Sequence, residues 1–176
     1  PGAPCERYST STCKRFANAS PRIFAIAPSS FLRSGQNTAI WSLSDPKRLV
    51  ANEMRRDSPT IFIGNDSINI LLDTFYDRRN AVMLGVNPIG GINDGQMSNE
   101  SQFSLDWNPV WAAKTGRFEN GWTVEAAIPF KSLRYRPGRS QVWGFNLKRF
   151  SPAENESSFI TRIPAGPGPR GMFMAS

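Results

Sequence analysis

The sequence contains no histidine among its 176 residues, and this absence removes several kinds of active site. A Ser-His-Asp or Cys-His arrangement needs an imidazole as its general base, and the common catalytic zinc sites use histidine ligands. An enzyme built from this chain would instead use carboxylates, lysine, tyrosine, arginine or a hard metal ion such as calcium. Histidine-based catalysis and histidine-ligated zinc are therefore excluded.

Long apolar runs and cysteines are also scarce. No apolar run approaches the ~20 residues that a helix needs to cross a bilayer, so we expect no transmembrane segment. No basic start followed by an apolar core is visible, so we expect no secretory signal within these residues. The only cysteines are Cys5 and Cys13. A local disulfide and two free thiols both fit this pair, which does not decide whether the protein is exported.

Acidic residues are outnumbered, with 14 Asp and Glu against 21 Lys and Arg, which gives a net charge of +7. Such a charge attracts nucleic acid, anionic lipid and acidic glycans without specificity. The arginines are scattered, and the aromatic–basic motif of an RNA-binding sheet is missing. A solvated basic surface is the simplest interpretation, and we predict no specific nucleic-acid partner.

Glycine and proline are frequent, at 14 residues each, and they divide the chain into short segments. Between these breaks lie segments that alternate apolar and polar residues or that are mostly apolar. They predict strands at residues 22–27, 38–44, 60–64, 67–75, 80–88, 110–118, 121–129, 141–150 and 157–164. Asn120 and Gly121, between two of these strands, are a hairpin signal. We therefore predict an all-β fold, an antiparallel and jelly-roll-like β-sandwich.

The remaining segments are predicted to contain one short helix and otherwise turns and loops. The helix is expected near residues 46–55, where Asp45 can cap it and Pro46 suits its first turn. Residues 88–95 have the composition of a turn, and residues 96–109 that of a loop. We expect an irregular N-terminal segment, one β-sandwich domain and a flexible tail, at residues 1–36, 37–164 and 165–176.

Four motifs occur in a fixed order between residues 44 and 150. They are SDPKRLVANEMRRD, then SINILLDTFYDRRNAVMLGVNPIGG, then DWNPVWAAKTGRFENGWTVEAAIPFKSLRY, then QVWGFNLKR. As a set they resemble the family 9 carbohydrate-binding modules. The version that they resemble most is found at the N-terminus of large bacterial exported or outer-membrane proteins of unknown activity.

This resemblance implies a β-sandwich that binds carbohydrate with aromatic side chains, often with structural calcium. Modules of this kind do not themselves catalyse, although they accompany hydrolases. The resemblance also implies a bacterial protein that is secreted, periplasmic or associated with the outer membrane. A carbohydrate ligand is therefore the expected partner, and calcium the expected cofactor.

The candidate ligand-binding residues are aromatic, amide and guanidinium side chains. A sugar ring presents a flat apolar face and a rim of hydroxyls, so its site needs an exposed aromatic beside polar partners. Trp107 and Trp111 flank a proline turn that contains Asn108, and Arg78 and Arg79 can hold a carboxylated ligand. Trp107 can face a ligand or pack, and Trp111 begins a strand, which favours the core. The tryptophans inside alternating strands are predicted to pack in the core: Trp122 and Trp143.

The candidate metal ligands are oxygen-bearing side chains near two turns. Asp73, Asp77 and Asn80 lie at short spacing between two strands, and Asp94 lies in a second oxygen-rich turn. Calcium prefers such ligands. The alternative is an ordinary hairpin tip, which needs polar residues in any case.

A small calcium-dependent hydrolase is the alternative function. A calcium-activated water could cleave an ester, lactone or glycosidic bond without histidine. Glycosidases need two carboxyl groups ~5–10 Å apart, and no spacing in this sequence establishes such a pair. We therefore expect a binding module first and a hydrolase second.

Overall fold

The structure is a computed structural model that describes most of the chain from residue 48 onwards. It describes residues 48–99, 102–119, 121–138, 141–161 and 163 and, before these, the strands at residues 14–15, 24–27 and 37–43. Cys5, Cys13 and residues 165–176 lie outside the described residues, as does most of segment 1–36. Two short strands, β1 and β2, are nevertheless described within that segment.

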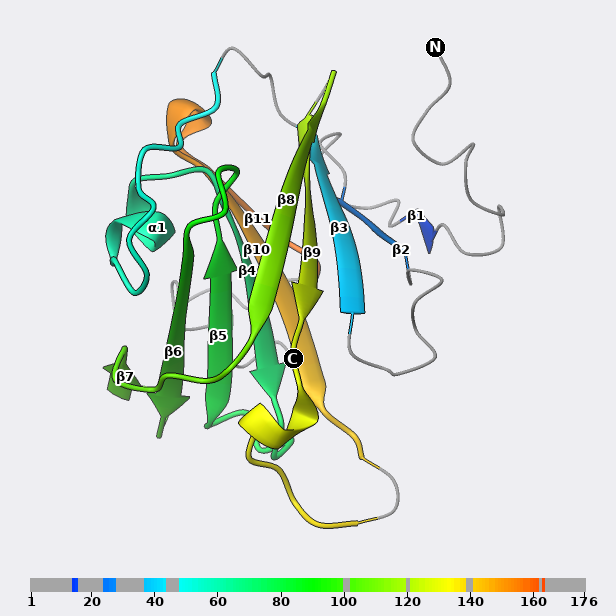
Figure 1. Cartoon of the computed structure of the whole chain (residues 1–176). Helices are drawn as coiled ribbons and strands as arrows, with labels where there is room; N and C mark the ends of the chain where they lie inside the picture. Colours follow the sequence, from blue (N-terminus) through cyan, green and yellow to red (C-terminus); the bar gives the residue numbers. More distant parts are fainter. Residues whose placement is uncertain are drawn as a thin grey trace.

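Two antiparallel sheets form the two layers of the molecule (Figure 1). The first sheet has the order β1-β2-β3-β9-β8, and the second has the order β11-β10-β4-β5-β6-β7. The first sheet consists of β1 (Lys14–Arg15), β2 (Phe24–Ala27), β3 (Asn37–Leu43), β8 (Ala112–Phe118) and β9 (Gly121–Ala127). The second consists of β4 (Ser67–Asp73), β5 (Ala81–Val86), β6 (Ile92–Ser98), β7 (Gln102–Ser104), β10 (Gly144–Ser151) and β11 (Glu156–Phe159). The predicted all-β sandwich is confirmed.

The core lies between the sheets and follows from the alternation of the strand sequences. Every second side chain of a strand points to the same face, so one set from each strand meets the other sheet. Trp122 is 1% exposed and lies in this core, as predicted. Its fully or nearly buried companions include Ile68, Ile70, Leu84, Val86, Val124 and Leu147. Trp143 instead precedes β10 and packs against Phe130 and Tyr135. A second, smaller apolar cluster lies on the opposite face of the second sheet and consists of Leu71, Ala81, Met83 and Met97.

Both predicted hairpins form. Strands β4 and β5 pair antiparallel from Ile68 opposite Val86 to Leu72 opposite Val82. Strands β8 and β9 pair up to Phe118 opposite Gly121, the glycine of the Asn-Gly signal, which is the first residue of β9. Local turn chemistry and alternation were sufficient to predict these pairs because the partners are close in sequence.

The helix predicted near residues 46–55 is wrong for the part that the structure describes, since residues 48–59 contain no helix. Side chains supply the hydrogen bonds that a helix would have made. The N–H of Val50 donates to Asp66, at 2.8 Å, and the N–H of Asn52 donates to Asn65, also at 2.8 Å. Because these acceptors satisfy backbone groups of the segment, it needs no helix and stays irregular, with a bend and turn at residues 55–57.

The strand predicted at residues 60–64 is also wrong, because a single helical turn, α1 (Thr60–Ile63), occupies it. In a strand Ile61 and Ile63 would share one face, but Ile61 is fully buried and Ile63 is 72% exposed. The N–H of Gly64 closes the turn on the carbonyl of Thr60 at 2.8 Å. No helix in the described part of the chain is long and apolar enough to cross a membrane.

Strands β6 and β7 replace part of the turn predicted for residues 88–95 and part of the loop predicted for residues 96–109. The turn itself forms before β6, where the N–H of Gly90 donates to the carbonyl of Asn87 at 3.1 Å. Asn93, Asp94 and Gly95 have low strand propensity, yet they pair with β5 in the middle of the sheet. Gly95 suits this place because a Cβ atom there would overlap the ring of Phe103 on β7. Tertiary packing therefore overrides the local turn signal.

Candidate functional site

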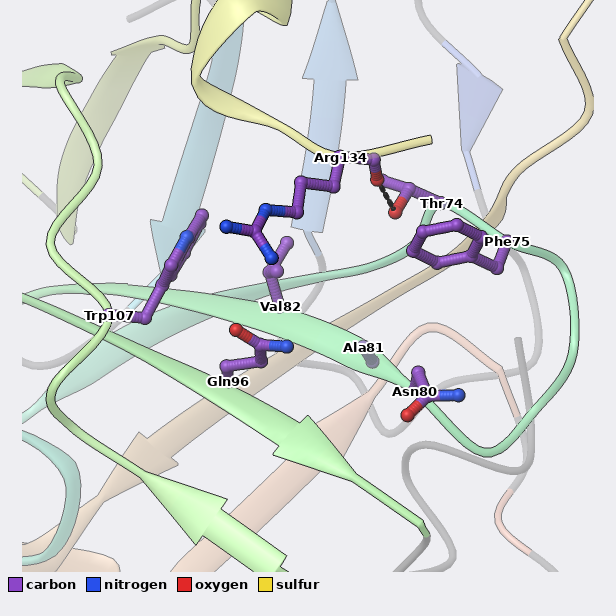
Figure 2. Close-up of a pocket in the computed structure, with 8 residues that line it drawn as sticks. All are labelled: Thr74, Phe75, Asn80, Ala81, Val82, Gln96, Trp107 and Arg134. Carbon is purple, nitrogen blue, oxygen red and sulfur yellow. Dashed lines mark hydrogen bonds between the residues drawn. The ribbon is translucent and has the colours of Figure 1, made fainter. Parts of the chain in front are cut away.

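A small hollow lies where three connections meet at one end of the sandwich. It has a volume of about 40 Å³. The β4–β5 turn, the β7–β8 connection and the segment after β9 contribute to its walls (Figures 1 and 2). The residues that matter to its chemistry are Thr74, Asn80, Val82, Gln96, Trp107 and Arg134. This hollow is the candidate site.

Its floor belongs to the inner face of the second sheet. Val82 on β5 lies directly opposite Gln96 on β6, so both side chains point to the same side. Leu84 is two residues from Val82 and belongs to the core between the sheets. The floor of the hollow is therefore continuous with the core between the sheets. Gln96 adds an amide group at the place where the core ends and the hollow begins.

Trp107 stands in the irregular connection between β7 and β8 and forms one wall (Figure 2). The sequence predicted an exposed loop there, but the side chain is half-buried and packs against the core. Two contacts hold its connection. The indole N–H of Trp111 donates to Asp94 at 2.6 Å, and Arg56 donates to the carbonyl of Pro109 at 3.1 Å.

Asp94 anchors this connection from the middle of β6. It is fully buried, and its Oδ1 accepts hydrogen bonds from both Trp111 and Arg56. Burial raises the pKa of Asp94, although the Trp111 and Arg56 donors act in the opposite direction. Because its carboxylate faces these two donors inside the protein, Asp94 positions the tryptophan connection and does not line the hollow.

Arg134 enters the hollow from the segment that follows η3 (Phe130–Ser132). The hydroxyl of Thr74 donates to the Arg134 carbonyl, and the hydroxyl of Ser132 donates to the carbonyl of Val110 at 2.7 Å. These bonds tie the segment to the β4–β5 turn and to the β7–β8 connection. Figure 2 shows the guanidinium reaching over the floor toward Trp107.

The β4–β5 turn is organised by its own two carboxylates. Asp73 accepts hydrogen bonds from the N–H groups of Phe75, Asp77 and Arg78, the last at 2.7 Å. Asp77 accepts from the N–H groups of Arg79 and Asn80, both at 2.8 Å. The two acids thus satisfy the backbone of a turn that contains Tyr76 and Arg78 at positive φ.

These hydrogen bonds bear on the calcium prediction. The side-chain amide of Asn80 occupies the remaining oxygen of Asp77, so every carboxylate oxygen of the turn accepts a donor. Oδ1 of Asp73 and Oδ1 of Asp77 each accept two donors, so only the Oδ2 atom of each carboxylate keeps a lone pair for a metal. No cluster of three or more Asp, Glu, Cys or His side chains that could hold a metal is found among the described residues. Calcium at this turn stays a prediction.

Asp94 does not join the other candidate metal ligands. It pairs with Leu84, which in turn pairs with Ile70 on β4, three residues before Asp73. That offset corresponds to about 10 Å along the strands, and two strand spacings add to it. The oxygen-rich residues of the sequence therefore occupy two separate places.

Among the predicted ligand-binding residues, Trp107 alone lines the hollow. Trp111 is 6% exposed and packs in the core, as its position at the start of a strand favoured. The other candidates are exposed and lie outside the lining: Arg78, Arg79 and Asn108. Gln96 and Arg134 were missed, because only strand register and the folding back of distant connections bring them beside Trp107.

Comparison of the sequence with protein-family models and with curated proteins finds no match. Solved structures do match the fold. A protein from Bacteroides uniformis described as a "putative carbohydrate-binding protein" aligns with 10% identity and a TM-score of 0.53, over 78% of this chain and 66% of that one. A family 9 carbohydrate-binding module from Caldicellulosiruptor kristjanssonii, solved with glucose and with cellotriose, aligns with 18% identity and a TM-score of 0.45. Those alignments cover 79% of this chain and 65% and 64% of the other.

The chain thus spans about two thirds of the length of the solved structures that it matches. At 10% identity, the likeness to the Bacteroides uniformis protein shows a common fold. The β-sandwich that the sequence motifs implied is the fold that this chain shares with that protein.

Proposed function

We propose that this chain is a non-catalytic module that binds carbohydrate at the hollow beside Trp107. The single observation that supports this most is the side-chain set of the hollow. An indole stands next to the amide of Gln96 and the guanidinium of Arg134. A sugar ring needs this combination, because its C–H face packs on an aromatic ring and its hydroxyls need polar partners. The described function of the Bacteroides uniformis protein with the same fold agrees with the proposal.

Binding fits this hollow better than hydrolysis does. None of the residues that line it is an aspartate or a glutamate, whereas a glycosidase needs two carboxyl groups at its site. The nearest buried acid on β6, Asp94, is engaged with Trp111 and Arg56. A location outside the cytoplasm of a bacterium, as the motif resemblance implies, belongs to the same proposal.

The test begins with a glycan array that identifies the oligosaccharides bound by the protein. Calorimetric titration of the strongest one then compares the parent with Trp107→Ala. We expect Trp107→Ala to weaken binding roughly 5- to 100-fold, as for truncation of an aromatic anchor. Its circular dichroism should remain that of a folded β protein, because Trp107 lies at the edge of the core.

Trp143→Ala is the matched control. Trp143 is also a half-buried tryptophan in a connection, but it packs on Phe130 and Tyr135 and does not line the hollow. Its removal should leave sugar affinity unchanged. Equal affinities for the parent and Trp107→Ala would overturn the proposed site.

A further inference from the structure

The hollow offers hydrogen-bond donors that have no partner in the described part of the chain. The guanidinium of Arg134, the amide of Gln96 and the indole N–H of Trp107 line it without a hydrogen bond or ion pair to any described residue. The other polar groups are occupied. Asn80 donates to Asp77, and Thr74 donates to the Arg134 carbonyl.

The segment that carries Arg134 is basic. The sequence contains no acidic residue between Glu125 and Glu154, and six Lys and Arg residues lie between them. The nearby acid Asp77 already experiences the positive charge of Arg136, which contributes to lowering the pKa of Asp77. The hollow therefore presents a cation that is unpaired among the described residues, together with further donors, and no carboxylate is among the residues that line it.

The size of the hollow limits what can enter it. A volume of about 40 Å³ is far below the 300 Å³ or more that a pocket for a whole small molecule has. Since a water-sized group needs roughly 10–15 Å³ on this measure, the hollow can take a substituent of about three heavy atoms. A carboxylate has three heavy atoms, and a sugar ring that bears it would lie over the mouth against Trp107.

We propose, on the basis of the carbohydrate-binding function above, that the preferred ligand is an acidic glycan whose sugar carboxylate enters the hollow and pairs with Arg134. The planar guanidinium matches a carboxylate with two parallel hydrogen bonds, and charge assistance makes such bonds stronger than those to a hydroxyl. Gln96 and the Trp107 N–H supply further donors to the same anion or to the adjacent hydroxyls.

The test compares two ligands that differ in charge and share one backbone: trigalacturonate and its fully methyl-esterified, neutral form. Titration calorimetry at about 0.1 M salt should show the acid binding the parent roughly tenfold or more tighter than the ester. Arg134→Gln should remove this difference by weakening the acid alone. Arg117→Gln, which removes an exposed arginine on β8 away from the hollow, should preserve it.

Four outcomes would overturn the acidic-glycan inference. If acid and ester bind the parent equally, carbohydrate binding stands and the carboxylate preference falls. If Arg134→Gln and Arg117→Gln weaken the acid equally, or if duplex DNA binds as tightly as the acid, the attraction comes from the net charge. If neither galacturonate form binds, the inference falls, and Trp107-dependent binding of other sugars on the array decides the proposed function separately.

Discussion

At the scale of single residues, Gly85 shows how tightly the outer face of the second sheet is packed. It lies in the middle of β5, under the ring of Phe62 from α1. A Cβ atom at this position would overlap Asn93 and would lie 2.6 Å from the Phe62 ring and 2.8 Å from Asn69. Only glycine leaves room for the neighbouring strands and α1 to close over the sheet at this point.

We therefore expect Gly85→Ala to lower the free energy of unfolding by about 1–3 kcal/mol, the usual cost of overpacking. Urea denaturation measures this change. Gly64→Ala is the control, because the nearest atom to its added Cβ would be the Thr60 carbonyl oxygen at 3.3 Å. If Gly85→Ala and Gly64→Ala have the same free energy of unfolding, the side chains around Gly85 can move to make room for a methyl group.

At the scale of elements, the β4–β5 turn keeps its shape through hydrogen bonds to Asp73 and Asp77. Partial burial raises the pKa of Asp77, but hydrogen bonds from Asn80 and Arg79 and the charge of Arg136 together lower it below its ordinary value. A carboxyl whose pKa is lower in the folded state stabilises the fold above its unfolded pKa, ~3.8–3.9. That contribution disappears as the pH falls through the folded pKa.

Asp77→Ala should accordingly cost about 1–2 kcal/mol of unfolding free energy at pH 7, as for hydrogen bonds to a charged group. The difference in unfolding free energy between parent and variant should become smaller as the pH is lowered from about 5 to 2. Denaturant titrations across this range measure it, with Glu119→Ala as an exposed acid that should show little change. If the difference in unfolding free energy does not depend on pH, Asp77 stabilises the turn through its shape and not through its charge.

The irregular segment at residues 48–59 depends on buried amides. Asn65 accepts N–H groups of this segment, and Asn87 donates to the carbonyl of Glu53 at 2.6 Å. Both amides are fully buried. They explain why a sequence with helix-start signals forms no helix here, since the backbone finds its partners in side chains from the following elements.

At the scale of the whole molecule, thermal melting reports anything that binds only the folded state. A bound metal raises the melting temperature by linkage, in proportion to the logarithm of its concentration above its Kd. We expect the melting temperature to rise with millimolar calcium and to fall with chelator, because Asp73, Asp77 and Asn80 place three oxygen-bearing side chains in one turn.

Asp77→Ala should abolish that rise, and magnesium at equal concentration should produce less of it, since magnesium needs a stricter geometry. Differential scanning calorimetry measures all three cases. Superimposable melting curves in calcium and in chelator would contradict the prediction that this protein binds calcium.

The sequence by itself determined the features that depend on local order. The alternation of Ile68 and Ile70, and of Trp122 and Val124, sets which side chains of each strand enter the core between the sheets, because side chains alternate along any strand. The two hairpins follow from turn residues between adjacent strands. The lack of histidine excludes its chemistry whatever the fold.

The tertiary structure alone decided what depends on distant partners. Asn93 to Gly95 form a strand because they pair with β5, while β7 pairs only with the later residues of β6, and no local pattern encodes this pairing. Gln96, Trp107 and Arg134 meet at one hollow because three separate connections fold to the same end of the sandwich. The spacing of residues in a sequence does not predict that these three side chains are close together. Their proximity arises from the strand register and from the packing of the two sheets.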